Sequence, residues 1–183
     1  MSRFSTALRL GGMRDEVDEL LEAWGRERND LDLAPVGVFS RITRLARRLE
    51  LERKDAFAAR GIEQWEFDVL AALRRAGAPY ELSPGRLLHE TLVTSGTMTN
   101  RVDRLSARGL VERYPDPDDR RGVLVRLTAD GKSTVDAAFA ALLEAERALL
   151  ERLPERDRTR LASLLRALLA PFADPARVDA PER

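Results

Sequence analysis

Hydrophobic side chains recur with helical spacing along most of this 183-residue chain. Near the N-terminus, Val17, Leu20, Leu21 and Trp24 stand at positions i, i+3, i+4 and i+7, which predicts an amphipathic helix from about Met13 to Glu27. The same spacing predicts further helices over about residues 36–60, 63–76, 84–90 and 95–108, a long one between 131 and 154, and a last one over 155–170. The chain is therefore predicted to be mainly α-helical.

A strand-like alternation interrupts the helices between residues 110 and 127. Leu110–Tyr114 is predicted to form one strand, and the alternating apolar residues of Val123–Leu127 predict a second. The charged, turn-rich segment Pro115–Gly122 lies between them, so the two strands form a β-hairpin. Tyr80–Leu82 could form one more short strand. The predicted fold class is thus mainly α with a small β-hairpin (α+β).

Turn-forming residues mark where the central helices end and begin. Gly77 to Pro79 stop one helix, and Ser83 followed by Pro84 starts the next. Gly109 is the expected left-handed cap after the helix that starts near Ser95. The order short helix, turn, helix and hairpin is that of a winged helix-turn-helix, whose second helix enters the major groove of DNA.

This order divides the chain into six expected parts. They are a disordered N-terminus (1–12), an added N-terminal helix with a linker (13–35), a helix shared by a dimer interface and the lobe (36–60), a winged helix-turn-helix DNA-binding lobe (61–129), C-terminal dimerisation helices (130–172) and a disordered tail (173–183). The leucine-rich helices at both ends exceed what such a lobe can cover. A second copy of the chain is therefore expected to bury them.

The second helix of the predicted motif opens with an unusual number of hydroxyl side chains. Ser and Thr are poor formers of helix interiors, but they suit a surface that faces phosphates and bases. Asn suits adenine edges, and Arg suits guanine edges or phosphates. The expected DNA-binding residues of this helix are Ser95, Thr97, Thr99, Asn100, Arg101 and Arg104, with Arg108 extending the polar side. The alternative is a polar, capped surface helix.

The loop of the hairpin mixes three acids with two arginines. Asp119 could orient a neighbouring arginine and leave one guanidinium, from Arg120 or Arg121, at the tip. A narrow minor groove attracts such a side chain. Taken alone, the loop could equally be a solvated charged turn.

Charge is distributed unevenly in a chain that is neutral overall. Residues 41–60 carry seven Arg or Lys against three acids, and residues 94–128 carry seven against five, whereas residues 1–40 carry five against eight. A local basic excess fits a protein with one DNA-binding face, although it also fits solvated, arginine-rich helices.

Several function classes find no support in the sequence. The chain has no cysteine and a single histidine, His89, which argues against a transition-metal site, and no cofactor is expected. It has no phosphate loop, no Gly-x-Ser-x-Gly and no histidine-centred triad, so it is not expected to be an enzyme. The longest apolar run, Ala137–Leu143, is too short to cross a membrane, and a cytoplasmic location is expected.

Four segments of the chain resemble the MarR family of bacterial transcription regulators, namely Ser95–Leu105, Gly109–Val111, Asp116–Arg121 and Val125–Thr128. The resemblance covers about residues 36–170. It implies a homodimer paired through its N- and C-terminal helices, with two winged lobes on a pseudo-palindromic operator. Asp119 and Arg121 match the Asp-x-Arg pattern of the family's wing, so Arg121 would enter the minor groove.

Three further segments resemble a branch of the family that responds to urate or small carboxylates. They are the N-terminal helix bearing Trp24, the segment Trp65–Asp68 and the segment Tyr80–Gly85. By that resemblance, the ligand-responsive positions would be Trp24, Asp68, Arg101 and Arg113. Three of them also have a purely structural interpretation. Trp24 could be a core or interface aromatic, and Asp68 and Arg113 could belong to ordinary ion pairs.

The function predicted from the sequence is that of a DNA-binding transcription regulator, most simply a repressor. It would act as a homodimer on double-stranded DNA and be released by a small anionic metabolite such as urate, xanthine or a citrate-like acid. The alternative is a winged-helix regulator or adaptor that acts through protein contacts without such a ligand.

Overall fold

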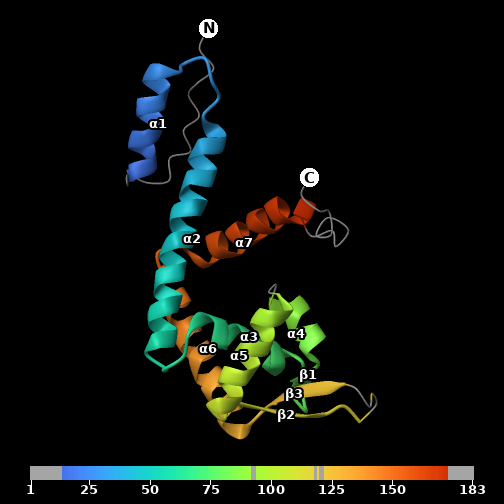
Figure 1. Cartoon of the computed structure of the whole chain (residues 1–183). Coiled ribbons are helices and arrows are strands. Elements are labelled where there is room, and N and C mark those ends of the chain that lie inside the picture. Colours follow the sequence, from blue (N-terminus) through green and yellow to red (C-terminus); the bar gives the residue numbers. More distant parts are fainter. Residues whose placement is uncertain (1–13, 92–93, 118, 120–121, 173–183) are drawn as a thin grey trace, which may run out of the picture. The chain divides into compact units, whose positions relative to one another are not determined.

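The computed structural model describes residues 14–91, 94–117, 119 and 122–172 and divides into two units, residues 1–51 and 52–183. The predicted N-terminal and C-terminal disordered segments lie outside the described residues. The helices are α1 (Glu16–Glu27), α2 (Ala34–Ala58), α3 (Gln64–Arg75), α4 (Pro84–Thr91), α5 (Ser95–Ala107), α6 (Ala129–Leu150) and α7 (Glu155–Leu169), followed by the short 3₁₀ helix η1 (Ala170–Phe172). Helices dominate and one small sheet completes the fold, as predicted (Figure 1).

In the first unit, α1 runs antiparallel beside the beginning of α2 (Figure 1). Asp15 caps α1 by accepting hydrogen bonds from the amides of Val17 and Asp18, so the helix starts at Glu16 rather than at Met13. The Arg41 guanidinium bonds Asp15 at 2.8 Å and Asp18 at 2.7 Å. Hydrogen bonding to Arg41 lowers the pKa of Asp15 to about 2. This ion pair is therefore intact at neutral pH and is lost only as the pH falls towards 2.

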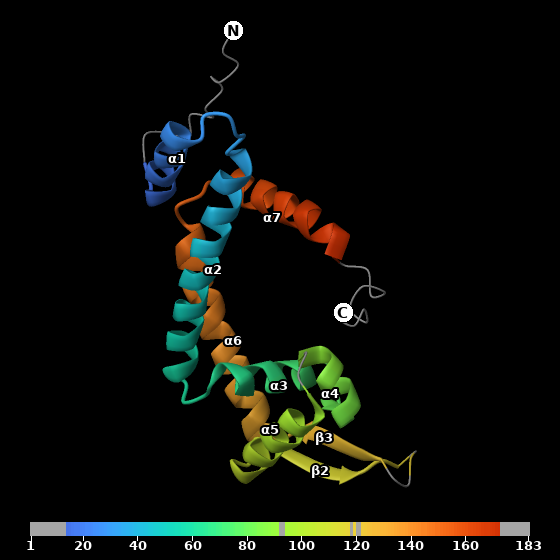
Figure 2. The same cartoon turned by 45° about the horizontal axis from the view of Figure 1, so that its top comes forward.

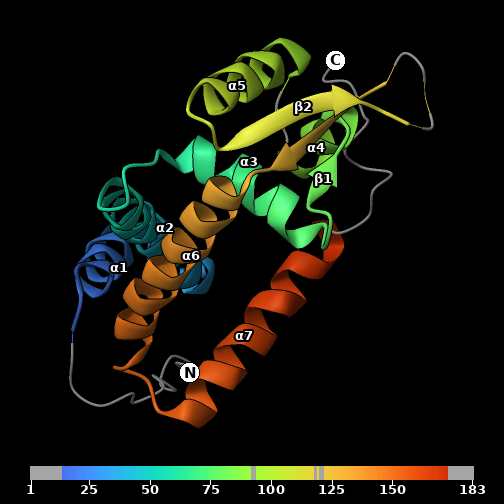
Figure 3. The ribbon, with the colours of Figure 1, turned by 90° about the horizontal axis from the view of Figure 1, so that it is seen from below.

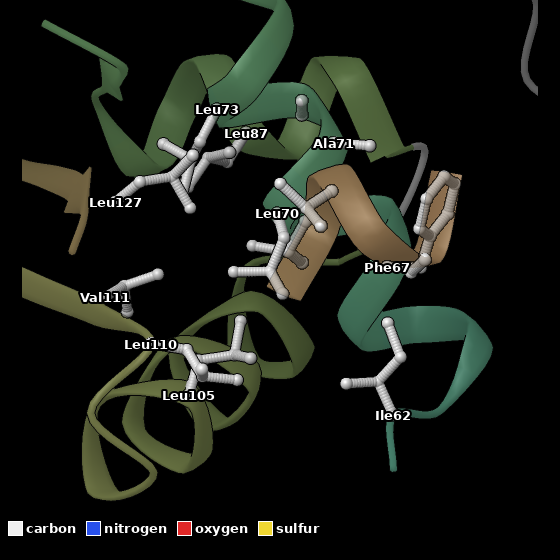
Figure 4. Close-up of a cluster of buried hydrophobic side chains, with 14 of the residues drawn as sticks. Ile62, Phe67, Leu70, Ala71, Leu73, Leu87, Leu105, Leu110, Val111 and Leu127 are labelled. Carbon is white, nitrogen blue, oxygen red and sulfur yellow. The ribbon is translucent and has the colours of Figure 1, made fainter. Parts of the chain in front are cut away.

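The core of the second unit surrounds α3, in which Val69, Leu70 and Leu73 are fully buried. In Figure 4, side chains from α4, α5 and the segment after α5 converge around Leu70, among them Leu87, Leu105 and Leu110. The apolar period of α3 predicts this buried face correctly. The apolar spacing of Trp65 with Val69 likewise predicts that Trp65 points inward, but it is only partly buried at the edge of the core.

The sheet has three antiparallel strands in the order β1-β3-β2, namely β1 (Glu81–Leu82), β2 (Val111–Pro115) and β3 (Val123–Leu127). The β2–β3 hairpin confirms the predicted wing, and it projects beside α5 (Figure 2). The pairing of β1 with β3 was not predicted. Arg126 of β3 joins the strands by bonding Glu81 at 2.6 Å and the Tyr114 hydroxyl at 2.8 Å.

The junction between the hairpin and α6 is unusually close. The Thr128 hydroxyl donates to the carbonyl of Gly109 at 2.7 Å and accepts from the amide of Gly131 at 2.9 Å. Gly131 lies against the backbone of Leu110, and a Cβ at this position would collide with the Leu110 carbonyl oxygen. Only glycine allows α6 to begin at this depth beneath the end of α5.

Helix α7 buries none of its residues. Its exposed apolar side chains are Leu164, Leu165, Leu168 and Leu169, and Phe172 of η1 follows them. Phe139, Leu143 and Leu150 of α6 are exposed as well. No helix in the described part of the chain is both long and apolar enough to span a bilayer.

Replacing Gly131 by alanine is expected to lower the free energy of unfolding by about 3 kcal/mol, because backbone rather than a flexible side chain must give way. Urea denaturation measures the loss. Gly96→Ala is the matched control, since Gly96 is also helical but has nothing within 4 Å of an added Cβ. That change should stabilise the fold by about 0.5–1 kcal/mol. Equal stability of the two variants would contradict the close junction.

Candidate nucleic-acid interface

Helix α5 lies on the surface of the second unit between the start of α3 and strand β2. It contacts α4, α3 and β2, so the elements form the predicted helix-turn-helix with a wing. Figure 3 shows α5 along β2, with α3 behind them. Met98, Val102 and Leu105 anchor the helix, since each is at most 1% exposed. The remaining faces of α5 are polar.

The face opposite these anchors carries Gly96 and Asn100. The helical period of 3.6 residues places both of them about half a turn from the Met98–Val102–Leu105 stripe. Asn100 is exposed, and its amide has no hydrogen-bond partner among the described residues. This amide is thus free to donate and accept two hydrogen bonds at once, as an adenine edge requires.

One flank of α5 faces the start of α3 and presents Thr97, Arg101, Arg104 and Arg108 at successive turns. The guanidiniums of Arg101 and Arg104 lie over the Trp65 ring, at 5.6 and 4.6 Å from its centroid. Arg104 also bonds Glu63 at 3.1 Å. These contacts orient both arginines near the exposed face of the helix.

The last arginine on this flank has a structural role instead. Arg108 Nη1 bonds the Glu66 carboxylate at 2.6 Å, and its Nη2 donates to the Gly61 carbonyl at 2.8 Å. Glu66 is 2% exposed and also accepts from the backbone amide of Glu63 at 2.9 Å. Arg108, which was expected to extend the polar side of the helix, is thus bound to the start of α3. A buried carboxylate needs its counterion, and this requirement fixes Arg108.

The opposite flank faces β2. Arg113 of this strand forms an ion pair with Asp103 at 2.8 Å and donates to the Thr99 carbonyl at 3.3 Å. Arg113 therefore ties the wing to the middle of α5. Any group that competes for its guanidinium would act on both elements at once.

The hydroxyl-rich opening of α5 satisfies part of its own hydrogen bonding. The hydroxyls of Thr94 and Thr97 lie 2.9 Å apart, and the Thr99 hydroxyl donates to the carbonyl of Ser95 at 3.2 Å. Thr94 occupies the N-cap position, although its side chain makes no capping bond. Ser95, Thr97 and Thr99 are all exposed, as expected.

Of the predicted wing residues, Asp119 belongs to the described part of the chain. Arg120 and Arg121 lie outside the described residues. The backbone carbonyl of Asp119 accepts from Gly122 at 2.8 Å, and the amide of Asp116 donates to the Gly122 carbonyl at 3.0 Å. These bonds close the base of the loop, and the roles expected for its side chains stay predictions.

Within the second unit, no contact in the described part of the chain joins the predicted ligand-responsive residues Asp68, Arg101 and Arg113 to one another. Asp68 accepts from Gln64 on its own helix at 2.9 Å and bonds neither arginine in the described part of the chain. Arg101 contacts Trp65, and Arg113 contacts Asp103. Trp24 belongs to the first unit, where it is 49% exposed. Their shared role remains a proposal.

Sequence reasoning missed Glu63 and Trp65 as parts of this surface. Trp65 fits the apolar period of α3, which predicts a core position for it. Its indole nitrogen donates to the Glu63 carboxylate at 2.9 Å. Indole N–H groups usually find a partner, so an acidic residue two positions earlier was a usable signal. The described residues contain no group of His, Cys, Asp or Glu that could hold a metal ion.

The Arg108–Glu66 pair is expected to stabilise the lobe measurably. Arg108→Met should lower the free energy of unfolding by about 2–4 kcal/mol, somewhat less than for a fully buried pair because the guanidinium is partly solvated. Glu66→Leu together with Arg108→Met should recover most of that loss, since no buried charge is left unpaired. A double-mutant cycle in urea measures the coupling, and additive effects of the two changes would contradict it.

Comparison with known proteins places these features in a family. A model described as the MarR family matches residues 60–122. The transcriptional regulator PecS of Dickeya dadantii is 34% identical over 150 residues, covering 82% of this chain and 90% of PecS.

Two solved structures are similar in fold. A MarR variant of E. coli in complex with operator DNA is 25% identical with a TM-score of 0.60, covering 85% of this chain and 99% of that one. Bordetella bronchiseptica BpsR, whose DNA binding is regulated by 6-hydroxynicotinic acid, is 28% identical with a TM-score of 0.54, covering 70% and 98%. These relatives are regulators rather than enzymes, and the chain belongs to the MarR family of transcription regulators.

Proposed function

We propose that the protein is a homodimeric repressor that binds a pseudo-palindromic operator through α5 and the β2–β3 wing. The observation that carries the proposal is the exposed face of α5. Core contacts, Trp65 and Arg113 hold three sides of this helix, and the fourth presents Asn100 with its amide unpaired among the described residues.

Each side chain of this surface has an assigned task. Asn100 reads a base edge in the major groove, and Arg101 and Arg104 contact guanine or phosphate. Ser95, Thr97 and Thr99 bond phosphates and fix the register of the helix on the duplex. At the wing, Arg121 enters the minor groove, with Arg120 on the adjacent backbone and Asp119 as the orienting carboxylate.

Dimerisation is proposed from the exposed apolar side chains of α7 and α6. Leu164, Leu168 and Leu169 are between 44% and 65% exposed on one chain, which is costly for side chains of this size in water. A two-fold partner would cover these side chains and place two copies of α5 about one helical turn of DNA apart.

The expected test outcome for DNA binding is a loss of sequence reading in Asn100→Ala. Fluorescence anisotropy on a duplex selected by the wild-type protein should show affinity reduced by about 1–3 kcal/mol, with the preference relaxed at one position of each half-site. Binding to random DNA and its salt dependence should not change. Asn29→Ala is the matched control, because Asn29 is an exposed amide in the first unit.

Light scattering on the same samples should give twice the 20.5 kDa mass of one chain. A monomer at micromolar concentration, or an Asn100→Ala variant that reads the selected site like wild type, would refute this assignment. Enrichment of no DNA fragment at all would leave the protein-contact adaptor as the remaining function.

We further propose that a small anionic metabolite, such as urate, xanthine or a citrate-like acid, releases the protein from DNA, with Trp24, Asp68, Arg101 and Arg113 as the responsive residues. The Arg113–Asp103 pair supports this, because an anion that takes the Arg113 guanidinium loosens the wing from α5. The donor fork of arginine suits planar anions two bonds at a time. The ligand must favour a form that fits DNA poorly, since it shifts the equilibrium only by its differential affinity.

Titration of the protein–DNA complex with urate, xanthine, citrate, trans-aconitate and 6-hydroxynicotinic acid tests this response. At least one anion should dissociate the complex below millimolar concentration. Trp24→Phe and Asp68→Ala should raise the concentration needed by about tenfold, which corresponds to about 1.4 kcal/mol of lost binding. Release that is identical in wild type and both variants would remove these residues from the ligand site.

A further inference from the structure

The start of α3 presents an aromatic ring and a carboxylate to two arginines of α5. Arg101 and Arg104 lie over Trp65, and Arg104 also bonds Glu63, which is 41 positions earlier in the chain. Glu63 in turn accepts the indole N–H of Trp65 at 2.9 Å. The four side chains therefore form one connected group beside the exposed face of α5, which we call the arginine platform.

The ring restricts side chains that are otherwise flexible. A free arginine samples many rotamers, and holding it for a contact costs conformational entropy. A planar guanidinium stacks on an indole by cation–π attraction without losing the N–H donors at its edge. Trp65 is itself held by the Glu63 bond and by packing against the core. The platform thus orders both arginines before a ligand arrives.

Two carboxylates each bind one arginine on this flank, and the exposed fractions of the carboxylates distinguish their roles. Glu66 is 2% exposed and cannot release Arg108 without leaving a buried charge. The Glu63 and Arg104 side chains are 61% and 54% exposed, so water can replace their bond at little cost. A DNA phosphate can replace it as well, because phosphate is an equally good partner for a guanidinium.

We infer that Trp65 is a positioning residue for Arg101 and Arg104, and that Glu63 is an internal competitor that occupies Arg104 until DNA phosphate displaces it. This inference rests on the proposed DNA binding by α5. Glu63 thereby lowers the affinity for any DNA, whereas Trp65 raises it by keeping the arginines ordered. Glu63 and Trp65 together therefore set how strongly Arg101 and Arg104 bind DNA phosphate, whereas Asn100 reads a base edge.

The experiment measures anisotropy of a labelled duplex over a range of KCl, in a Trp24→Phe background where Trp65 is the only tryptophan. Glu63→Gln keeps an acceptor for the indole N–H but removes the charge. It should tighten binding about 3–10-fold at low salt and steepen the salt slope by about one ion. Arg104→Gln should weaken binding and abolish the effect of Glu63→Gln. Trp65 fluorescence should change when DNA binds.

The ring is tested separately. Trp65→Leu should weaken binding about tenfold, and Trp65→Phe, which keeps an aromatic face, should recover most of it. If Trp65→Leu does not fold, two measurements still test the platform. One compares Trp65→Phe with wild type, and the other asks whether Arg104→Gln abolishes the effect of Glu63→Gln. Glu90→Gln is the matched control, because Glu90 forms an exposed pair with Arg75 in the same lobe and is bonded to no α5 side chain among the described residues.

Failure of this inference is distinguishable from failure of the proposed function. If wild type binds no DNA, the proposed function is wrong. If wild type binds and Asn100→Ala loses sequence preference, but Glu63→Gln and Trp65→Leu behave like wild type, the platform is wrong and the function stands. Weaker binding by Glu63→Gln, or an equal gain in Glu90→Gln, would also overturn the competitor role.

Discussion

The buried carboxylate of Glu66 is the constraint on which the exposed surface of α5 depends. Its position at the start of α3, with 2% exposure, requires a cation within hydrogen-bond distance, and Arg108 at the end of α5 supplies it. The end of α5 is thereby fixed against α3. Arg104 and Arg101 lie one and two turns earlier, so the same constraint brings them to Glu63 and Trp65. One structural ion pair thus orients the whole polar flank.

The other flank is fixed by the wing. Arg113 reaches from β2 to Asp103, and Arg126 joins β3 to the neighbouring strands through Glu81 and Tyr114. Beneath them, Gly131 lets α6 approach the backbone of Leu110. Helix α5 is consequently held from both sides and from below. These attachments determine which side chains of α5 lie on its free face. The intrinsic helix propensity of α5 contributes little, because its Ser and Thr residues make it low.

Much of this arrangement was predictable from the sequence, because the apolar period and the turn residues act locally. The helices, the hairpin and the polar face of α5 follow from spacing alone, and Gly109 with φ +70° ends α5 as expected. The pairing of β1 with β3 was not predictable in this way. A two-residue strand has no period, and its partner Arg126 lies 45 positions later. The role of Arg108 was missed for a similar reason, since sequence gives its charge but not the burial of Glu66.

Trp65 shows where prediction from the apolar period ends, because the period indicates a core position whereas the structure shows polar contacts as well. Periodicity assigns the residue to the core, and the ring does pack at the core's edge. Its N–H and its face are nevertheless directed to polar groups, the Glu63 carboxylate and two guanidiniums. An amphipathic ring at the border of a core serves both demands at once. The exposure of Glu63, against the burial of Glu66 three residues later, then separates an arginine whose ion pair water can replace from one that is committed to the fold.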